Sequence, residues 1–218
     1  MGKPLALSLK DIVARTLSST KGVKPSFDDY HVIKTLLILY ERGPMGRQLL
    51  SKNLGIGITP VRTLIKRLKL LNIIEVDPVA GCFLTSYGYR IAESIRNTIS
   101  NIIEASNILD KEFLLYEKSY AFLIKKGTAI LRQFNVTNVR DHIIRYGAKA
   151  VIIIYIENDL AYIPPYREFN EKGYISLKKL RSILKAENED AIILIFSNSD
   201  IEAEKALYSA LLELNILH

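Results

Sequence analysis

Between residues 26 and 85, glycine and proline divide the chain into short segments, and this punctuation constrains the fold more than any other feature. RGP (42–44) ends one apolar-periodic stretch, because Gly suits a helix C-terminal cap and Pro cannot continue the helix. GIG (55–57) ends a second stretch, and DPVAG (77–81) separates two short apolar runs. The pattern therefore predicts helices at about 27–42, 46–53 and 59–71, then a hairpin with strands 73–76 and 82–85.

Capping residues indicate where these helices begin. Ser26 and Asp29 resemble a capping pair for the first helix. Thr59 is predicted to cap the third, with Pro60 at the first helical position, where proline is tolerated best. A short helix within residues 5–18, capped by Ser8, is predicted to precede them, followed by a linker to residue 25.

The positive charge of the chain is concentrated in the same segment. The whole chain has a formal net charge of +7. Residues 30–72 hold eight basic residues and a single acidic one, Glu41, whereas residues 108–218 hold equal numbers of basic and acidic residues. A localised excess of this kind is typical of a surface that binds a polyanion.

The third predicted helix has two different sides. Val61, Leu64, Ile65, Leu68 and Leu71 form an apolar stripe. Arg62, Thr63, Lys66 and Arg67 share the other side, and Lys69 lies further round. Basic residues on a helix are usually a solvated face. Here the helix follows a short helix and a turn, leads into a hairpin, and has no acidic residue near it between Leu49 and Ile74, which together favour contact with DNA.

The stretch RGPMGRQLLSKNLGIGITPVRTLIKRLKLLNIIEV resembles the winged helix-turn-helix of bacterial and archaeal transcription regulators. It is most similar to archaeal regulators that carry a small, poorly characterised C-terminal α/β domain. The resemblance implies a homodimer that binds duplex DNA sequence-selectively, with the third helix in the major groove. The residues expected to face DNA are Arg47, Gln48, Ser51, Lys52, Thr59, Arg62, Thr63, Lys66, Arg67 and Lys69. The predicted wing departs from the pattern, since its tip carries Asp77 and no basic residue.

A long connecting helix is predicted from Ser86 to about Ile108. Residues at spacings of three or four would form a continuous stripe along it over about six turns: Ile91, Ile95, Ile99, Ile102, Ser106 and Leu109. Two interpretations remain open: the stripe packs against the N-terminal helix or the second domain, or it forms a coiled-coil-like dimer seam. The residues predicted to lie in such a dimer seam are Ile91, Ile95, Ile99 and Ile102.

The rest of the chain alternates between apolar runs and helical patterns. AVIIIYI (150–156) and AIILIF (191–196) are predicted to be buried strands, with helices at about 127–147, 177–187 and 200–215. This order predicts a small α/β sandwich with a partly parallel sheet. Its tyrosines either line an effector pocket or pack in the core; they are Tyr146, Tyr155, Tyr162, Tyr166 and Tyr174.

The expected fold class is therefore α+β with two domains. The expected divisions are 1–25 (N-terminal helix and linker), 26–85 (winged helix-turn-helix), 86–110 (connecting helix) and 111–218 (α/β domain for dimerisation or effector binding). A protein-interaction adaptor that uses the winged helix for protein contacts is the alternative function.

Several other classes of protein are not expected. Cys82 is the only cysteine and the three histidines are far apart in sequence, so no metal site or cofactor is predicted. The sequence contains no dinucleotide-binding fingerprint, no P-loop and no nucleophile elbow, so an enzyme is not expected. The apolar runs are too short for a membrane-spanning helix of about 20 residues, and a cytoplasmic protein is expected.

Overall fold

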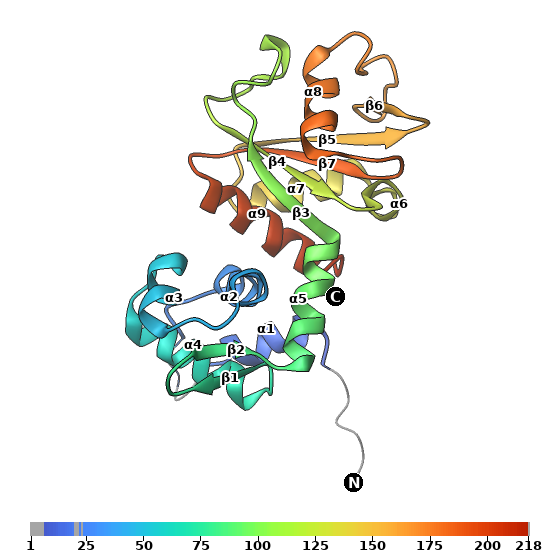
Figure 1. Cartoon of the computed structure of the whole chain (residues 1–218). Coiled ribbons are helices and arrows are strands. Elements are labelled where there is room, and N and C mark those ends of the chain that lie inside the picture. Colours follow the sequence, from blue (N-terminus) through green and yellow to red (C-terminus); the bar gives the residue numbers. More distant parts are fainter. Residues whose placement is uncertain (1–6, 20–21, 23, 218) are drawn as a thin grey trace. The chain divides into compact units, whose positions relative to one another are not determined.

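The computed structural model describes residues 7–19, 22 and 24–217. It contains two compact units, one formed mainly by the chain up to Arg96 and one from Asn97 to Ile216 (Figure 1). Helices predominate in the first unit and a five-stranded sheet forms the second. The expectation of a mixed α+β chain with two domains is therefore confirmed.

The N-terminal unit has the predicted order of elements. Four helices, a hairpin and a further helix follow one another: α1 (Leu9–Leu17), α2 (Asp29–Arg42), α3 (Arg47–Leu54), α4 (Ile58–Leu70), β1 (Ile74–Asp77), β2 (Gly81–Leu84) and α5 (Ser86–Thr98). The apolar faces predicted from periodicity are buried, with Ile33, Leu36 and Leu64 fully inaccessible to solvent.

The hairpin is fixed to the segment that precedes α3. The backbone N–H groups of Met45 and Cys82 each donate to the carbonyl oxygen of the other at 2.9 Å. Gly81 has φ +95°, and a Cβ atom there would lie 2.5 Å from the Met45 carbonyl oxygen. Only glycine fits this close approach. The hairpin and the start of α3 are consequently held in one arrangement.

Helix starts were predicted correctly in some places and wrongly in others. Ser8 is the N-cap of α1, as predicted. Asp28, not Ser26, caps α2, and its side chain and His31 form the capping box. Gly57 precedes α4, so the predicted cap Thr59 lies inside the helix. Pro60 remains acceptable because first-turn N–H groups have no intrahelical acceptor.

The predicted long helix to Ile108 is wrong. α5 ends at Thr98 and the chain continues as strand β3 (Ile99–Glu104), which pairs antiparallel with β4 (Ser119–Ile124). The four isoleucines of the predicted dimer seam are therefore divided between two kinds of element, with Ile91 and Ile95 on the helix and Ile99 and Ile102 on the strand. No continuous helical seam exists, and homodimerisation stays a prediction.

A β-bulge explains the error. Ile99 pairs with Ile124 and Ile102 with Phe122, so three steps along β3 match two along β4. A bulge inserts one residue into a strand, and this changes the usual two-residue spacing of one face to three. The spacing of isoleucines therefore imitates a helical turn, although β-branched side chains favour strands.

The sheet of the C-terminal unit has the strand order β3-β4-β7-β5-β6 and every neighbouring pair is antiparallel. The prediction of a partly parallel sheet is wrong. β5 (Ala150–Glu157), β6 (Leu160–Tyr162) and β7 (Ala191–Phe196) occupy the predicted positions. The stretch predicted as largely helical divides into α6 (Gly127–Arg132) and α7 (Val136–Arg145).

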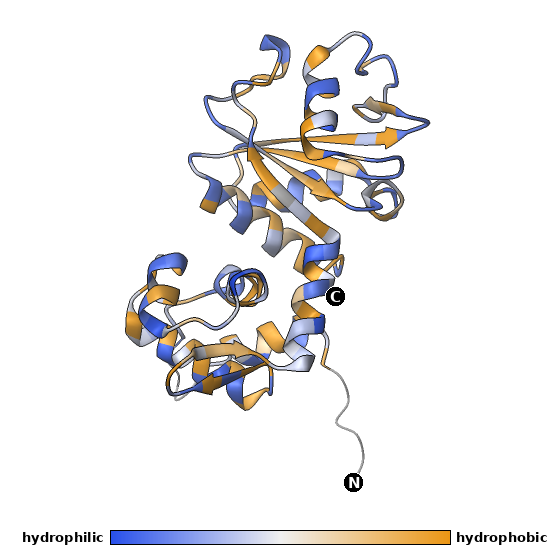
Figure 2. Ribbon diagram, in the orientation of Figure 1, coloured by the Kyte–Doolittle hydropathy of each residue, from blue (hydrophilic) through white to orange (hydrophobic). Residues whose placement is uncertain are grey.

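Helices cover both faces of this sheet, which explains why its strands are apolar throughout. α8 (Ile175–Leu184) lies over one face, and α7 and α9 (Asp200–Glu213) lie over the other (Figure 1). β5 and β7 are largely hydrophobic along their length (Figure 2). At the start of α8, Asp110 accepts hydrogen bonds from the Ser176 backbone N–H (3.1 Å) and hydroxyl (2.7 Å).

Candidate nucleic-acid interface

α4 is oriented by its apolar side. Val61, Leu64, Ile65 and Leu68 are buried, whereas Arg62, Lys66 and Lys69 are exposed. These three cations follow one another at intervals of four and three residues, so they lie along one face of the helix. Lys69, predicted to lie further round, is only about 20° from Arg62 in projection along the axis.

These three side chains have no ionic partner within the described part of the chain. The acidic residues that flank α4 in sequence are Glu41, which pairs with Arg96 at 3.4 Å, and Glu75 on β1, which is exposed and forms no ion pair with the three cations. Like charges on one helical face repel one another, which disfavours the helix slightly. A polyanion that lies along this face would remove the repulsion.

Arg67 does not belong to this exposed face. It is about 140° from Arg62 around the helix. Its Nη1 group donates to the carbonyl oxygens of Thr16 (2.6 Å) and Ser18 (2.8 Å), and its guanidinium lies 5.8 Å from the ring centroid of Phe27. The carbonyls at the end of α1 have no intrahelical donors, and Arg67 satisfies them. The prediction that Arg67 shares one exposed stripe with Arg62 is wrong; Arg67 joins α4 to α1.

Two of the threonines predicted to face DNA line a pocket with Arg67. Thr59 and Thr63 line a shallow pocket together with Arg67 and residues 24–27. The Thr63 hydroxyl donates to the Thr59 carbonyl oxygen at 3.3 Å. Thr59 is exposed and Thr63 half-buried, so both can be reached from solvent. They border the cationic face without adding charge to it.

The start of α3 also presents polar groups to solvent. Arg47 and Gln48 are exposed in the first turn, and no side chain caps this helix after Gly46. Uncapped N–H groups and the helix dipole favour an anion at such an end. Lys52 is exposed one turn later. Ser51 has a structural role instead, because its hydroxyl donates to the Ile56 carbonyl oxygen at 2.5 Å and fixes the turn to α4.

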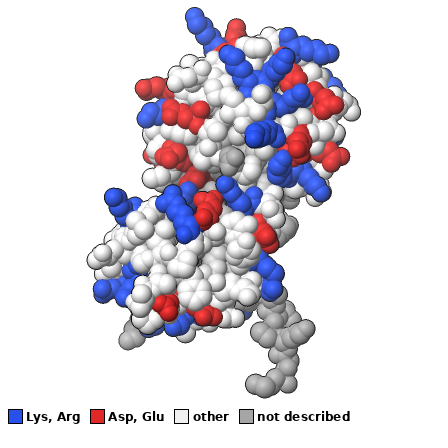
Figure 3. Space-filling model, in the orientation of Figure 1, with Lys and Arg blue, Asp and Glu red and all other residues white. Residues whose placement is uncertain are grey.

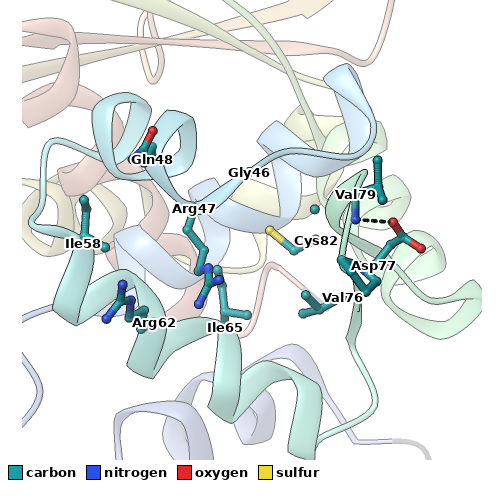
Figure 4. A pocket seen from close by; sticks show the side chains of 12 residues that line it. Gly46, Arg47, Gln48, Ile58, Arg62, Ile65, Val76, Asp77, Val79 and Cys82 are labelled. Atoms are coloured by element: carbon teal, nitrogen blue, oxygen red, sulfur yellow. Dashed lines mark hydrogen bonds between the residues drawn. The ribbon is translucent and has the colours of Figure 1, made fainter.

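An open groove of about 390 Å³ connects these parts. α3, α4 and the hairpin line it, and the side chains of Arg47 and Arg62 reach into it from the two helices (Figure 4). Cys82 lies at its base; burial raises the pKa of the thiol, which donates to the Met45 carbonyl oxygen at 2.8 Å. The thiol is therefore neutral and serves the packing of the hairpin.

The hairpin tip is apolar and its one acid is used locally. Asp77 accepts hydrogen bonds from the backbone N–H groups of Ala80 and Val79, and these bonds lower the pKa of its carboxyl group. Asp77 therefore holds the turn closed. Val79 at the tip is 97% exposed. As the sequence predicted, the tip carries no basic side chain.

No group of three or more His, Cys, Asp or Glu side chains in the described residues is arranged to hold a metal ion. Within the same ranges, none of the helices combines the length and the apolarity needed to cross a bilayer.

The chain is similar in sequence to two protein-family models. Residues 30–90 match the family described as PH0730-like, N-terminal domain, and residues 115–214 match a domain of unknown function, DUF4443. A solved structure, a hypothetical protein PH0730 from Pyrococcus horikoshii OT3, is similar with a TM-score of 0.62 and 24% sequence identity. The similarity covers 88% of this chain and 96% of that one, so the two proteins share a fold. No curated protein matches significantly.

Proposed function

We propose that the N-terminal unit is a winged helix-turn-helix that binds duplex DNA, with α4 as its recognition helix and β1–β2 as its wing, and that the protein regulates transcription. The observation that carries this proposal is the row of Arg62, Lys66 and Lys69 on one exposed face of α4, without a carboxylate partner among the described residues. An α-helix fits the major groove of B-DNA, where arginine can bind guanine through two hydrogen bonds.

The surroundings of α4 support the same docking. The uncapped start of α3, with Arg47 and Gln48, suits a phosphate of the DNA backbone. Lys52 adds a second basic contact next to it. Phosphate contacts of this kind set the position of a helix on the duplex, while the residues of α4 would read the bases.

A salt titration tests the proposal directly. The full chain is titrated with duplex DNA at several salt concentrations, and log K should fall linearly with log salt by about 0.9 for each phosphate contacted. Lys66→Glu should abolish binding. Lys178→Glu makes the same charge change on an exposed position of α8 and is the matched control. Absence of binding at low salt, or equal loss in both variants, would refute the proposal.

A second candidate, a protein-interaction adaptor, is favoured by the apolar side chains on the same unit. Leu70 on α4 is 76% exposed, and Val79 at the hairpin tip is 97% exposed. Exposed apolar side chains of this kind are typical of protein contact sites when they form one patch. If the protein is an adaptor of this kind, the DNA titration would show no binding. Capture of a partner protein would then be unchanged by Lys66→Glu but lost in Val79→Asp.

A further inference from the structure

A polar cluster in the C-terminal unit surrounds a second pocket, of about 340 Å³. Its lining includes residues of α6, β5 and β6, and β6 is an edge strand of the sheet (Figure 1). Arg132 comes from the end of α6, Tyr155 from β5 and Tyr162 from β6. Val136, Pro164, Pro165 and Arg167 complete its lining. The volume is at the lower end of the range of pockets that bind small molecules.

One carboxylate organises the two arginines of this pocket. Glu157 pairs with Arg132 at 2.6 Å and with Arg167 at 2.8 Å. The Tyr162 hydroxyl donates to Glu157 at 2.7 Å and accepts from Arg132 at 3.1 Å. Both carboxylate oxygens are therefore occupied. Two guanidinium groups against one carboxylate leave the cluster with one uncompensated positive charge.

The arginines also retain hydrogen-bonding capacity. A guanidinium group has five N–H donors. Arg132 uses its Nη2 group for Glu157 and Tyr162, and its Nη1 and Nε groups have no acceptor among the described residues. Its guanidinium lies 5.6 Å from the ring centroid of Tyr155, and that of Arg167 lies 4.9 Å from the ring of Tyr162. The aromatic rings and Glu157 hold both groups in place.

Tyr155 adds a donor that the fold itself leaves unused. The side chain is 2% exposed, and its hydroxyl has no hydrogen-bond partner among the described residues. Burial raises the pKa of Tyr155 to about 12, so the hydroxyl keeps its proton at neutral pH. An unpaired buried hydroxyl destabilises a fold, and the buried polar groups of proteins are normally paired. The hydroxyl is closed off from solvent, but Tyr155 lines the pocket, so a small shift of its ring allows a ligand to pair with the hydroxyl.

We propose that this pocket binds the carboxylate of a small organic acid, held by Arg132 and the Tyr155 hydroxyl, with the apolar part of the acid against Val136, Pro164 and Pro165. A monoanion matches the single uncompensated charge, whereas a phosphate dianion would exceed it. The planar guanidinium group suits a carboxylate, which accepts two parallel hydrogen bonds. The start of α7 at Val136 adds the favourable end of a helix dipole.

The test uses benzoate, benzamide and inorganic phosphate as probes. The full chain, labelled in its tyrosine rings, is titrated by NMR. Benzoate should shift the ring signals of Tyr155 and Tyr162 at millimolar concentration or below. Benzamide has the same shape without the charge and should cause no shift. Phosphate should bind at least tenfold more weakly than benzoate. This result does not depend on whether the N-terminal unit binds DNA.

Two variants locate the binding groups. Arg132→Gln should abolish the benzoate shifts, and Tyr155→Phe should weaken benzoate about tenfold, the usual effect of losing one hydrogen bond to a charged group. Tyr155→Phe removes a hydroxyl that has no protein partner, so its melting temperature without probe should equal or exceed that of the native chain. Arg140→Gln and Tyr166→Phe are matched controls at exposed positions outside the pocket.

The proposal is overturned by any of three results. These are no shift with benzoate, tighter binding of phosphate than of benzoate, and benzoate affinity that is unchanged in both Arg132→Gln and Tyr155→Phe.

Discussion

In the C-terminal unit, several cationic side chains lie beside carboxylates, whereas three cations on α4 have no such neighbour among the described residues. Lys125 is 3.0 Å from Asp190, Arg145 is 2.8 Å from Glu213, and Arg181 is 3.3 Å from Glu171. On α4, Arg62, Lys66 and Lys69 are exposed and unpaired within the same described ranges. On the face of the molecule shown in Figure 3, basic and acidic side chains are intermixed over the C-terminal unit.

The comparison shows that the number of cations in a segment does not by itself indicate a surface that binds an anion. Whether those cations already have carboxylate partners is the more informative observation. A cation that has a carboxylate to itself is already neutralised and contributes to structure. Cations gathered on one face without carboxylates produce a field that only another molecule can neutralise. Arg67 shows that the distinction operates within a single helix, because this arginine is engaged by two carbonyl oxygens while its neighbour Lys66 is exposed.

The largest effect is expected at the ion pair whose carboxylate is the most deeply buried among the described residues. Asp190 is 3% exposed and accepts hydrogen bonds from Lys125 Nζ, from the Lys126 N–H and from the Glu187 N–H. Asp190→Ala leaves all three donors without their acceptor and should lower the free energy of unfolding by about 3 kcal/mol. Urea denaturation of the C-terminal unit measures this change.

Glu213→Ala is the control for this prediction, because it removes an exposed pair with Arg145. This substitution should lower the free energy of unfolding by less than about 1 kcal/mol. Equal losses of stability in the two variants would show that burial does not determine how much an ion pair contributes to the free energy of unfolding. The distinction between buried and exposed pairs would then be wrong.

The second largest effect concerns DNA recognition. Arg62→Ala should weaken binding to the preferred site, recovered by selection from random DNA, by about 1–3 kcal/mol and should affect random DNA much less. Lys52→Ala should weaken both about equally and reduce the salt slope by about one. Fluorescence anisotropy on the two DNAs distinguishes these outcomes. If both variants change the two affinities equally, Arg62 is not the residue that reads the bases.

Arg67 and Lys66 allow a cation bound by the fold and an exposed cation to be compared on the same helix. Arg67→Ala removes the hydrogen bonds to Thr16 and Ser18 and should lower the stability of the N-terminal unit by about 1–2 kcal/mol. The affinity of the folded protein for DNA should change little. Lys66→Ala should do the reverse and reduce DNA affinity at unchanged stability. Thermal melts and DNA titrations of both variants would contradict this assignment if Arg67→Ala lost affinity and kept its stability.

Local signals explain why the N-terminal unit was predicted well. The order α2, α3, α4, β1 and β2 follows from apolar periodicity and from glycine and proline at the turns, which act within a few residues. Arg67 could not be assigned in this way. The carbonyls it satisfies lie 51 and 49 residues earlier in the chain, and periodicity cannot distinguish a free cation from one bound by a distant helix end.

The C-terminal unit depends more on contacts between distant residues. β3 was predicted as helix because Ile99 and Ile102 are three residues apart, and the bulge allows residues at this spacing to share one face of a strand. The direction of the strands was also wrong, since apolar strands covered on both faces look alike whether parallel or antiparallel. Tyr155 and Tyr162 were recognised as members of a tyrosine-rich region, yet their grouping with Arg132 and Glu157 required the folded sheet.

The smallest effect is expected at the hairpin tip. No basic residue lies at the tip, so the proposed wing contributes little electrostatic attraction to DNA. Val79 at the tip is 97% exposed and can be replaced without disturbing the core. Val79→Lys should raise DNA affinity a few-fold and steepen the salt slope by about 0.9, the contribution of one phosphate contact. Leu114→Lys adds the same charge at a 42% exposed position of the C-terminal unit and controls for the change in net charge. An equal gain in both variants would mean that only total charge matters and that the tip does not approach DNA, whereas a gain confined to Val79→Lys would extend the unpaired cationic face of α4 across the groove to the hairpin.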